Sequence, residues 1–513
     1  MSAPISASGS AAAPTVAAPR LSAAAWLWVL IAATLAVRLL AGALAPLTED
    51  EAYYRLWSLR PDFGYFDHPP MIAWWLWLGR EVAGDTALGV RLMPALGAAA
   101  TTALIFDLAR QAGFTERVAL RAAVWFNATI LIGLGGQLAV PDVPNTLFWA
   151  AALCCAFRAV RAGRGAWWLA AGAAAGLACL AKYSALFLAP GLVLWLLLTK
   201  DGRRALLTPW PWLAAVIAVA VFSPNVMWNA QHHWVTFQKQ FGRVAGSDFA
   251  PIYVLKLFAD QFGLLNPLMA VFLGLAIARR IAWQLLIVGA PFALYLVIHG
   301  LHDAVQGQWP APLYPLAAIA AAAAAEGGRG WRAALRTAVP WFGFGVCALV
   351  IAFTIAPLDG RLPFRDPGVV YRGWPAFYAQ VEQARQATGA SWIGATNYGL
   401  TAQLSDTAAI RGPVTEIYER ARFTFETPAE RADFSKPGLI LSPPRSPALG
   451  ALSTCFGQIR QLPDIVRGQG TSAVTYTAYL VSQPKYEMEY AGCYRPDLPN
   501  FVSSQPGTAS TSP

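Results

Sequence analysis

The chain has 513 residues, of which 56% are hydrophobic and 13% are charged, and it carries 21 tryptophans. A soluble domain has about a quarter charged residues, so this composition excludes an ordinary soluble protein. The net charge of +10 does not indicate a nucleic-acid partner, because the Arg and Lys residues cluster at alternate ends of long apolar runs, as the positive-inside rule predicts. The composition therefore predicts a polytopic α-helical membrane protein.

The chain begins with residues 1–24, which are rich in Ala, Ser and Pro and predict a disordered cytoplasmic tail. Apolar runs and basic clusters then predict about eleven spans within residues 25–357, with external loops at 46–87 and 224–261. The expected spans begin or end near these residues: 25–45, 88–109, 118–135, 144–160, a tight pair around 182–183 that ends at 200, 208–223, 262–278, 299, 309 and 338–357.

Residues 358–501 have a different pattern, with alternating apolar stretches and an amphipathic helix near 374–388. They predict a small soluble α+β domain outside the membrane, followed by a disordered tail at 502–513. The alternation of apolar runs and basic clusters predicts a multi-pass membrane protein with this domain on the external side. It also places all five histidines in external loops: 68, 232, 233, 299 and 302.

Cys455 and Cys493 are the only cysteines of the C-terminal domain, and an oxidising compartment permits a disulfide between them. The alternative is two buried free thiols. The other four cysteines fall within expected spans and are most simply small packing residues: 154, 155, 179 and 347.

The acidic segment after the first span is the strongest candidate site. Asp50 and Glu51 are followed by Tyr53 and Tyr54, and the same loop reaches Asp67-His68-Pro69-Pro70. A solvated acidic pair at a membrane boundary can be a simple anchor. The nearby aromatic residues and the rigid Pro-Pro corner instead favour a shaped site. A carboxylate at a low-dielectric boundary has a raised pKa, which suits it to accept a proton from an attacking hydroxyl.

Two further positions on the same side carry charge at span boundaries. Asp142 lies among apolar neighbours, and it is either a site residue or the N-cap of the following helix. Lys182, followed by Tyr183, is either a phosphate-binding cation or an interfacial lysine whose charge reaches the membrane surface.

A polar loop contains His232 and His233, followed by Arg243, and its mixture of basic and aromatic groups suits a phosphate and a sugar ring. These histidines together with Asp67 leave a divalent cation as an open alternative, although no recognised ligand spacing is present. No other cofactor is expected.

The order of the motifs resembles the GT-C glycosyltransferases of the protein O-mannosyltransferase and aminoarabinose transferase superfamily, over roughly residues 25–330. The elements that carry this resemblance are Asp50-Glu51-Ala52-Tyr53-Tyr54, Tyr65-Phe66-Asp67-His68-Pro69-Pro70, Pro141-Asp142, Ala181-Lys182-Tyr183 and Gln308-Trp309-Pro310-Ala311-Pro312.

The resemblance implies that a sugar is transferred outside, with inversion, from a polyprenyl-phosphate donor. By this resemblance Asp50 is the base, Glu51 its partner and Asp142 the second acid, while Lys182 and Arg243 receive the donor phosphate. Aminoarabinose transferases differ at two positions, with a Lys in place of His68 and a Glu in place of Asp67.

The acceptor is expected to be lipid A or core oligosaccharide, another envelope glycan, or a protein Ser or Thr, held with help from the C-terminal domain. The alternative function is a flippase or transporter of lipid-linked sugars. Such a protein is expected to have related halves or broken midplane helices. The sequence has no internal repeat, and its acids cluster outside the apolar runs.

Overall fold

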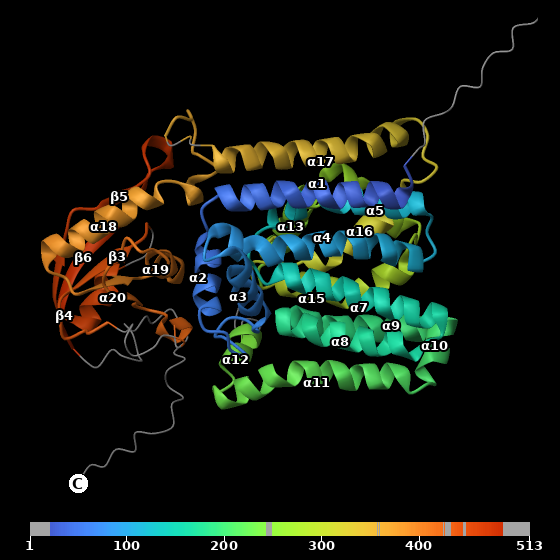
Figure 1. Cartoon of the computed structure of the whole chain (residues 1–513), viewed down its shortest axis with the longest axis horizontal. Coiled ribbons are helices and arrows are strands. Elements are labelled where there is room, and N and C mark those ends of the chain that lie inside the picture. The colour runs from blue at the N-terminus through green and yellow to red at the C-terminus, as the bar shows by residue number, and fades with distance from the viewer. Residues whose placement is uncertain are drawn as a thin grey trace, which may run out of the picture.

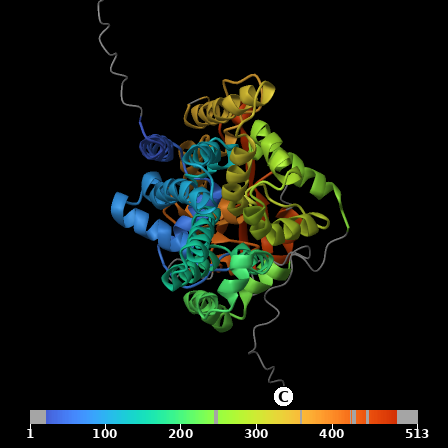
Figure 2. The same ribbon diagram turned by 90° about the vertical axis from the view of Figure 1, so that its right-hand side faces the viewer.

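The protein is described here by a computed structural model, in which a bundle of helices carries a smaller α/β domain at one end (Figure 1). The described residues are 21–242, 249–356, 358, 360–423, 425, 432–444 and 448–485. Seen along the bundle, the helices form a closed group with the strands of the α/β domain behind them (Figure 2).

The bundle helices follow the apolar runs of the sequence. In chain order they are α1 (Ala23–Leu44), α2 (Glu49–Ser58), α3 (Met71–Ala83), α4 (Ala87–Gln111), α5 (Glu116–Asn127), α6 (Ile130–Gly135), α7 (Asp142–Ala162), α8 (Gly165–Ala181), η1 (Tyr183–Phe187), α9 (Leu188–Leu198), α10 (Lys200–Leu206), α11 (Trp210–Gln231), α12 (Val235–Phe241), α13 (Ile252–Leu264), α14 (Pro267–Ala278), α15 (Trp283–Gly300), η3 (Ala311–Leu313), α16 (Tyr314–Ala324) and α17 (Trp331–Ile355).

Within the described residues, six of these helices are long and apolar enough to cross a membrane: α1, α4, α7, α11, α15 and α17. The number rises to eight if each of two helix pairs, bent by 113°, is a single span. Helices α8 and α16 are shorter but also apolar. A polytopic helical membrane protein is therefore correct, whereas the count of eleven spans stays a prediction.

Two expected loops are partly helical. The predicted loop at 46–87 contains α2 and α3, because Thr48 and Glu51 form a capping box that starts α2. The predicted loop at 224–261 is also largely helical, since α11 continues to Gln231 and α12 follows. His299 was expected in a loop, but it is buried in the last turn of α15, where the apolar run continues.

The α/β domain is built on a six-stranded sheet in which β1 (Trp392–Ala395) runs parallel to both β2 (Val414–Glu416) and β3 (Gly438–Ser442). The long strand β6 (Val474–Pro484) pairs antiparallel with β3, β4 (Phe456–Gln461) and β5 (Ile465–Arg467). The remaining elements are η4 (Val369–Tyr371), α18 (Trp374–Thr388), α19 (Tyr398–Ser405), η5 (Arg420–Phe423), α20 (Ala448–Cys455) and η7 (Gly470–Ser472).

The carboxyl ends of β1 and β2 lead directly into α19 and η5, and α19 packs against α2. This edge of the sheet therefore meets the end of the helix bundle. In the same domain Cys455 is buried and takes part in a disulfide, while Cys493 lies outside the described residues.

Candidate active site

Helix α2 turns two neighbouring carboxylates in different directions. Glu51 is fully buried and forms an ion pair with Arg91 of α4, with 2.6 Å between Oε2 and Nη2. The Ala139 amide also donates to Glu51. Burial raises the pKa of Glu51, but the charge and hydrogen bonds of Arg91 outweigh it and hold the pKa below its ordinary value. Glu51 therefore serves as a structural anion inside the bundle.

Asp50 faces a different environment, towards the α/β domain. Its Oδ1 accepts a hydrogen bond of 2.7 Å from the Tyr398 hydroxyl, at the start of α19. Burial raises the pKa of Asp50, and the negative charge of Asp67 adds to the effect, whereas the Tyr398 hydrogen bond and the positive charge of Arg422 oppose it. No described residue donates a hydrogen bond to Oδ2, so that oxygen is available to a substrate.

Asp67 joins the bundle to the C-terminal domain. Its Oδ2 lies 2.5 Å from Nη1 of Arg422 in η5 and accepts a hydrogen bond of 3.0 Å from the Tyr53 hydroxyl. The Arg422 guanidinium also lies over the Tyr398 ring, 4.4 Å from its centroid. A continuous polar and aromatic network thus runs from Asp67 through the C-terminal domain to Asp50.

Asp142 and Lys182 form an ion pair at the other side of the site, with 2.6 Å between Oδ1 and Nζ. Asp142 is the first residue of α7 and Lys182 follows the last residue of α8. The N-cap of α7 is Pro141, without a side-chain hydrogen bond, so Asp142 is not the N-cap that local sequence left open. The Lys182 ammonium also lies 5.9 Å from the Trp309 ring centroid.

These groups line one polar cavity of about 110 Å³. Its walls come from the bundle and the C-terminal domain together. The lining residues are Asp50, Tyr53, Tyr54, Asp67, His68, Val140, Pro141, Asp142, Lys182, Gln240, Gln306, Gln308, Trp309, Tyr398 and Arg422.

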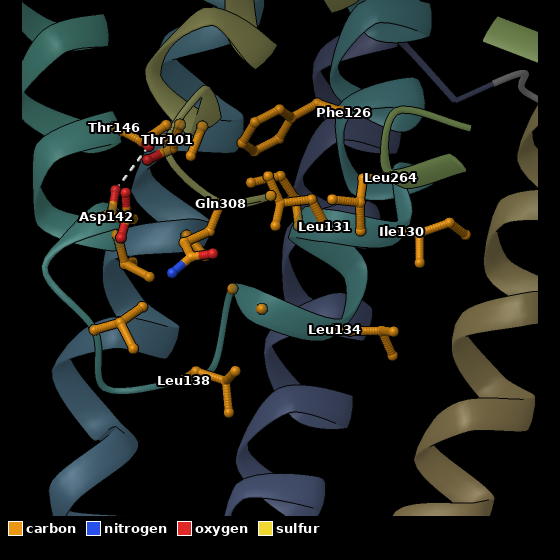
Figure 3. A pocket seen from close by; sticks show the side chains of 18 of the residues that line it. Thr101, Phe126, Ile130, Leu131, Leu134, Leu138, Asp142, Thr146, Leu264 and Gln308 are labelled. Carbon is orange, nitrogen blue, oxygen red and sulfur yellow. Dashed lines mark hydrogen bonds between the residues drawn. The ribbon is translucent and has the colours of Figure 1, made fainter. Parts of the chain in front are cut away.

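A second cavity, of about 430 Å³ and mostly apolar, opens from the same place. It shares four lining residues with the polar cavity: Asp50, Val140, Asp142 and Gln308. Figure 3 shows Asp142 and Gln308 on one side of this cavity, with Leu131, Leu134 and Leu264 across from them. A charged head group and a long apolar tail could therefore be bound side by side.

Several predicted site residues lie outside the polar cavity. The Tyr183 hydroxyl donates to Asn225, and its ring stacks on another aromatic ring of α12. The His232 ring stacks on Trp228 at 4.0 Å, and His233 is exposed. Tyr183 and His232 are therefore held by neighbouring side chains, away from the charged groups. Arg243 lies outside the described residues.

Sequence reasoning missed Tyr398, Arg422, Gln240 and Gln306. Tyr398 and Arg422 have no local signal, because they reach Asp50 and Asp67 only through the folding of the C-terminal domain. Trp309 could have been found, since the Gln308-Trp309-Pro310 motif had been noted. Among the described residues, no group of three or more His, Cys, Asp or Glu side chains is arranged to hold a metal ion.

Known proteins share both this fold and this sequence pattern. Residues 67–228 match the family described as dolichyl-phosphate-mannose-protein mannosyltransferase. The lipid A galacturonosyltransferase RgtD of Rhizobium johnstonii is 27% identical over 388 residues, which cover 72% of this chain and 79% of RgtD. The chain is a glycosyltransferase, similar in sequence to the GT-C glycosyltransferases.

The fold of this glycosyltransferase is that of ArnT from Cupriavidus metallidurans. Crystal structures of ArnT bound to undecaprenyl phosphate and in the apo state both give a TM-score of 0.61, at 16% and 17% identity. Each comparison covers 89% of the glycosyltransferase and 98% of ArnT. The likeness includes the C-terminal domain as well as the helix bundle, because it extends over nearly all of both chains.

Proposed function

We propose that this glycosyltransferase moves a sugar from a polyprenyl-phosphate donor to lipid A at the periplasmic face of a bacterial inner membrane, with inversion at the anomeric carbon. The observation that carries this proposal is the meeting of the two cavities at Asp50 and Asp142. A lipid-linked sugar phosphate needs an apolar channel for its chain and a charged pocket for its head group. The flippase alternative has no support among the relatives, which are named as transferases.

Asp50 is proposed as the general base. A hydroxyl oxygen of the acceptor attacks the anomeric carbon while Asp50 takes the hydroxyl proton. The new bond joins the acceptor oxygen to the sugar, and the bond from the anomeric carbon to the phosphate oxygen breaks. The electron pair leaves with the phosphate. Burial raises the pKa of Asp50, which makes it a better proton acceptor than an ordinary solvated carboxylate.

Lys182 is proposed to receive the leaving phosphate. Its ammonium is paired with Asp142 in the structure, so donor binding exchanges one anionic partner for another. A cation that meets the departing phosphate stabilises the charge that develops in the transition state. Four other predicted substrate-binding residues line the same polar cavity: Tyr53, Tyr54, Asp67 and His68.

The apolar cavity is proposed to hold the prenyl chain, and the opposite end of the bundle is proposed to face the cytoplasm. The short basic helix α10 lies at that opposite end, away from the C-terminal domain (Figure 1). Basic residues favour the cytoplasmic side of a membrane protein, which supports an external position for the cavity and for the C-terminal domain. The full topology is proposed to have about eleven spans.

The proposal is tested with Asp50→Asn. Purified protein is given lipid A and, in separate reactions, undecaprenyl phosphate carrying galacturonic acid or aminoarabinose, and products are detected by mass spectrometry. We expect the variant to lose about 10²–10⁴-fold in turnover, as general bases contribute. It should still bind undecaprenyl phosphate. Transfer at an undiminished rate by Asp50→Asn, or no product with any donor for the native protein, would overturn the proposed function.

A further inference from the structure

The C-terminal domain reaches into the polar cavity rather than merely covering it. Tyr398 is the first residue of α19, and Arg422 lies in η5, so both follow the carboxyl ends of parallel strands. Ligands of open α/β sheets bind outside these strand ends. Here the strand ends are turned towards α2 of the bundle, where they meet Asp50 and Asp67.

The contact with Asp50 is specific. The Tyr398 hydroxyl donates to Oδ1 of Asp50 across 2.7 Å, and the tyrosine ring packs against Tyr53 with 5.2 Å between centroids. One oxygen of the base is thereby fixed, and the carboxylate plane with it. The other oxygen is left for the hydroxyl of an acceptor.

Arg422 packs on the ring of Tyr398 and helps to fix its position. Its guanidinium covers the tyrosine ring and binds Asp67, while its backbone carbonyl accepts a hydrogen bond of 3.0 Å from the Tyr53 hydroxyl. Two groups of the bundle, Tyr53 and Asp67, and two of the C-terminal domain therefore determine where the Asp50 carboxylate points. Such support is what keeps a catalytic group within the narrow range of productive geometry.

We propose that Tyr398 is the positioning residue of the Asp50 base and that the C-terminal domain is an integral part of the active site. The inference rests on the proposed role of Asp50. A hydroxyl that donates to a carboxylate favours its ionised form, so Tyr398 keeps the base deprotonated as well as oriented. The C-terminal domain then controls the chemistry of the reaction in addition to any contact with the acceptor.

Other charged groups around Asp50 stay in place when Tyr398 is changed. Glu51 of α2, Asp67 of the following loop and Arg422 of η5 act on Asp50 through their charges. Asp142 of α7 and Lys182 line the same cavity, as does the titratable side chain of His68. Because this background is common to the native protein and the variant, a difference in pH dependence reports the Tyr398 hydrogen bond.

The test compares pH profiles of kcat/KM for the full-length protein, with lipid A and whichever undecaprenyl-phosphate sugar the native protein uses. Tyr398→Phe removes the hydroxyl and keeps the ring. We expect the acidic limb of its profile to move to higher pH by about one unit. This shift corresponds to the free energy of one hydrogen bond to a charged group. Activity should approach the native level at high pH.

A docking control separates this role from a structural one. The Gln403 side chain of α19 donates to the Leu47 carbonyl across 2.8 Å, so Gln403→Met removes a different contact between the C-terminal domain and the bundle. We expect this control to lower the rate equally at every pH, with no shift of the limb. An unshifted limb in Tyr398→Phe, or the same shift in both variants, would overturn the positioning role. The proposed function would still stand if Asp50→Asn lost transfer.

Discussion

The two sides of α2 do different work, although they carry adjacent acids. The side towards the bundle buries Glu51 against Arg91, where the ion pair lowers the pKa of the carboxyl. The side towards the C-terminal domain holds Asp50 in a polar cavity, where burial raises its pKa. Consecutive residues of a helix point in directions about 100° apart, so neighbours in sequence belong to separate environments. One side stabilises the fold and the other is suited to proton transfer.

The largest expected effect is a loss of stability on the side of α2 that faces the helix bundle. Arg91→Met leaves Glu51 buried without its cation, which costs about 3–5 kcal/mol of stability. Arg91 also donates to carbonyl groups at the end of α1, and these hydrogen bonds are lost as well. We expect a large fall in the unfolding temperature of the detergent-solubilised protein. The double variant Arg91→Met/Glu51→Met should recover part of the loss, and a native unfolding temperature for the single variant would refute the structural role.

A smaller effect, on lipid binding, is expected for Lys182, the cation that lines the polar cavity. Lys182→Met removes a charged donor, which should weaken binding of undecaprenyl phosphate by about 10-fold to 100-fold. Asp142→Asn should have the opposite tendency, because it releases Lys182 from its ion pair. Binding can be measured by scintillation proximity with labelled lipid. Lys256→Met, an exposed lysine on α13, is the control, and equal losses in both lysine variants would count against a specific phosphate site.

The apolar cavity should give a still smaller effect. Gly135 lines this cavity, and a Cβ added there would meet only one atom, Cδ1 of Leu131 at 4.0 Å. Gly135→Phe should therefore fold and should obstruct the lipid chain. We expect about a tenfold loss of affinity for undecaprenyl phosphate. This loss corresponds to about two methylene groups of the lipid chain that are no longer buried. A short-chain prenyl phosphate should bind equally well. Gly274→Phe, at an open position of α14, is the matched control, and equal behaviour of the two variants would argue against a prenyl groove.

The last effect concerns the stability of the C-terminal domain, which supplies part of the wall of the polar cavity. Burial raises the pKa of Glu416, at the end of β2, to about 7 from an ordinary 4.5. The folded state thus binds the proton more tightly, so the free energy of unfolding falls as pH rises from about 4.5 to about 7, by about 2 kcal/mol. Limited proteolysis of the full chain across this range should show the trend. Glu416→Gln should reduce the slope without abolishing it, because burial also raises the pKa of Asp406 in the same domain to about 7.

The control for this trend is Glu382→Gln. The Arg385 hydrogen bond holds the pKa of Glu382 at about 2, so its contribution to stability is lost only as pH falls towards that value. We expect the slope between pH 4.5 and 7 to be unchanged in Glu382→Gln. A slope that is unchanged in Glu416→Gln would show that Glu416 does not contribute to it.

The sequence predicted a good part of this arrangement. Apolar runs indicated the helices, and local motifs indicated Asp50, Asp67, His68, Asp142 and Lys182, which line one cavity in the structure. The contacts that the sequence did not predict join residues that are far apart along the chain. Tyr398 is 348 residues from Asp50, and no local pattern marks that contact.

Other differences between prediction and structure arise within single elements. Glu51 was grouped with Asp50 because the two are adjacent, but the helix separates their side chains. His232 and Tyr183 have chemically suitable side chains, yet each is stacked on a neighbouring aromatic ring outside the cavity. Local composition indicates which residues can do chemistry, whereas the direction of each side chain is decided by packing.

The short connection between α1 and α2 has a mechanical consequence. Only residues 45–48 separate the two helices. Arg91 binds both the carbonyl groups at this junction and Glu51, which is adjacent to the proposed base, Asp50. A change in the tilt of α1 should therefore move Asp50, because the connection is too short and too firmly hydrogen-bonded to absorb the change. Since membrane thickness sets helix tilt, we expect lipid chain length to act as a control on the rate of sugar transfer.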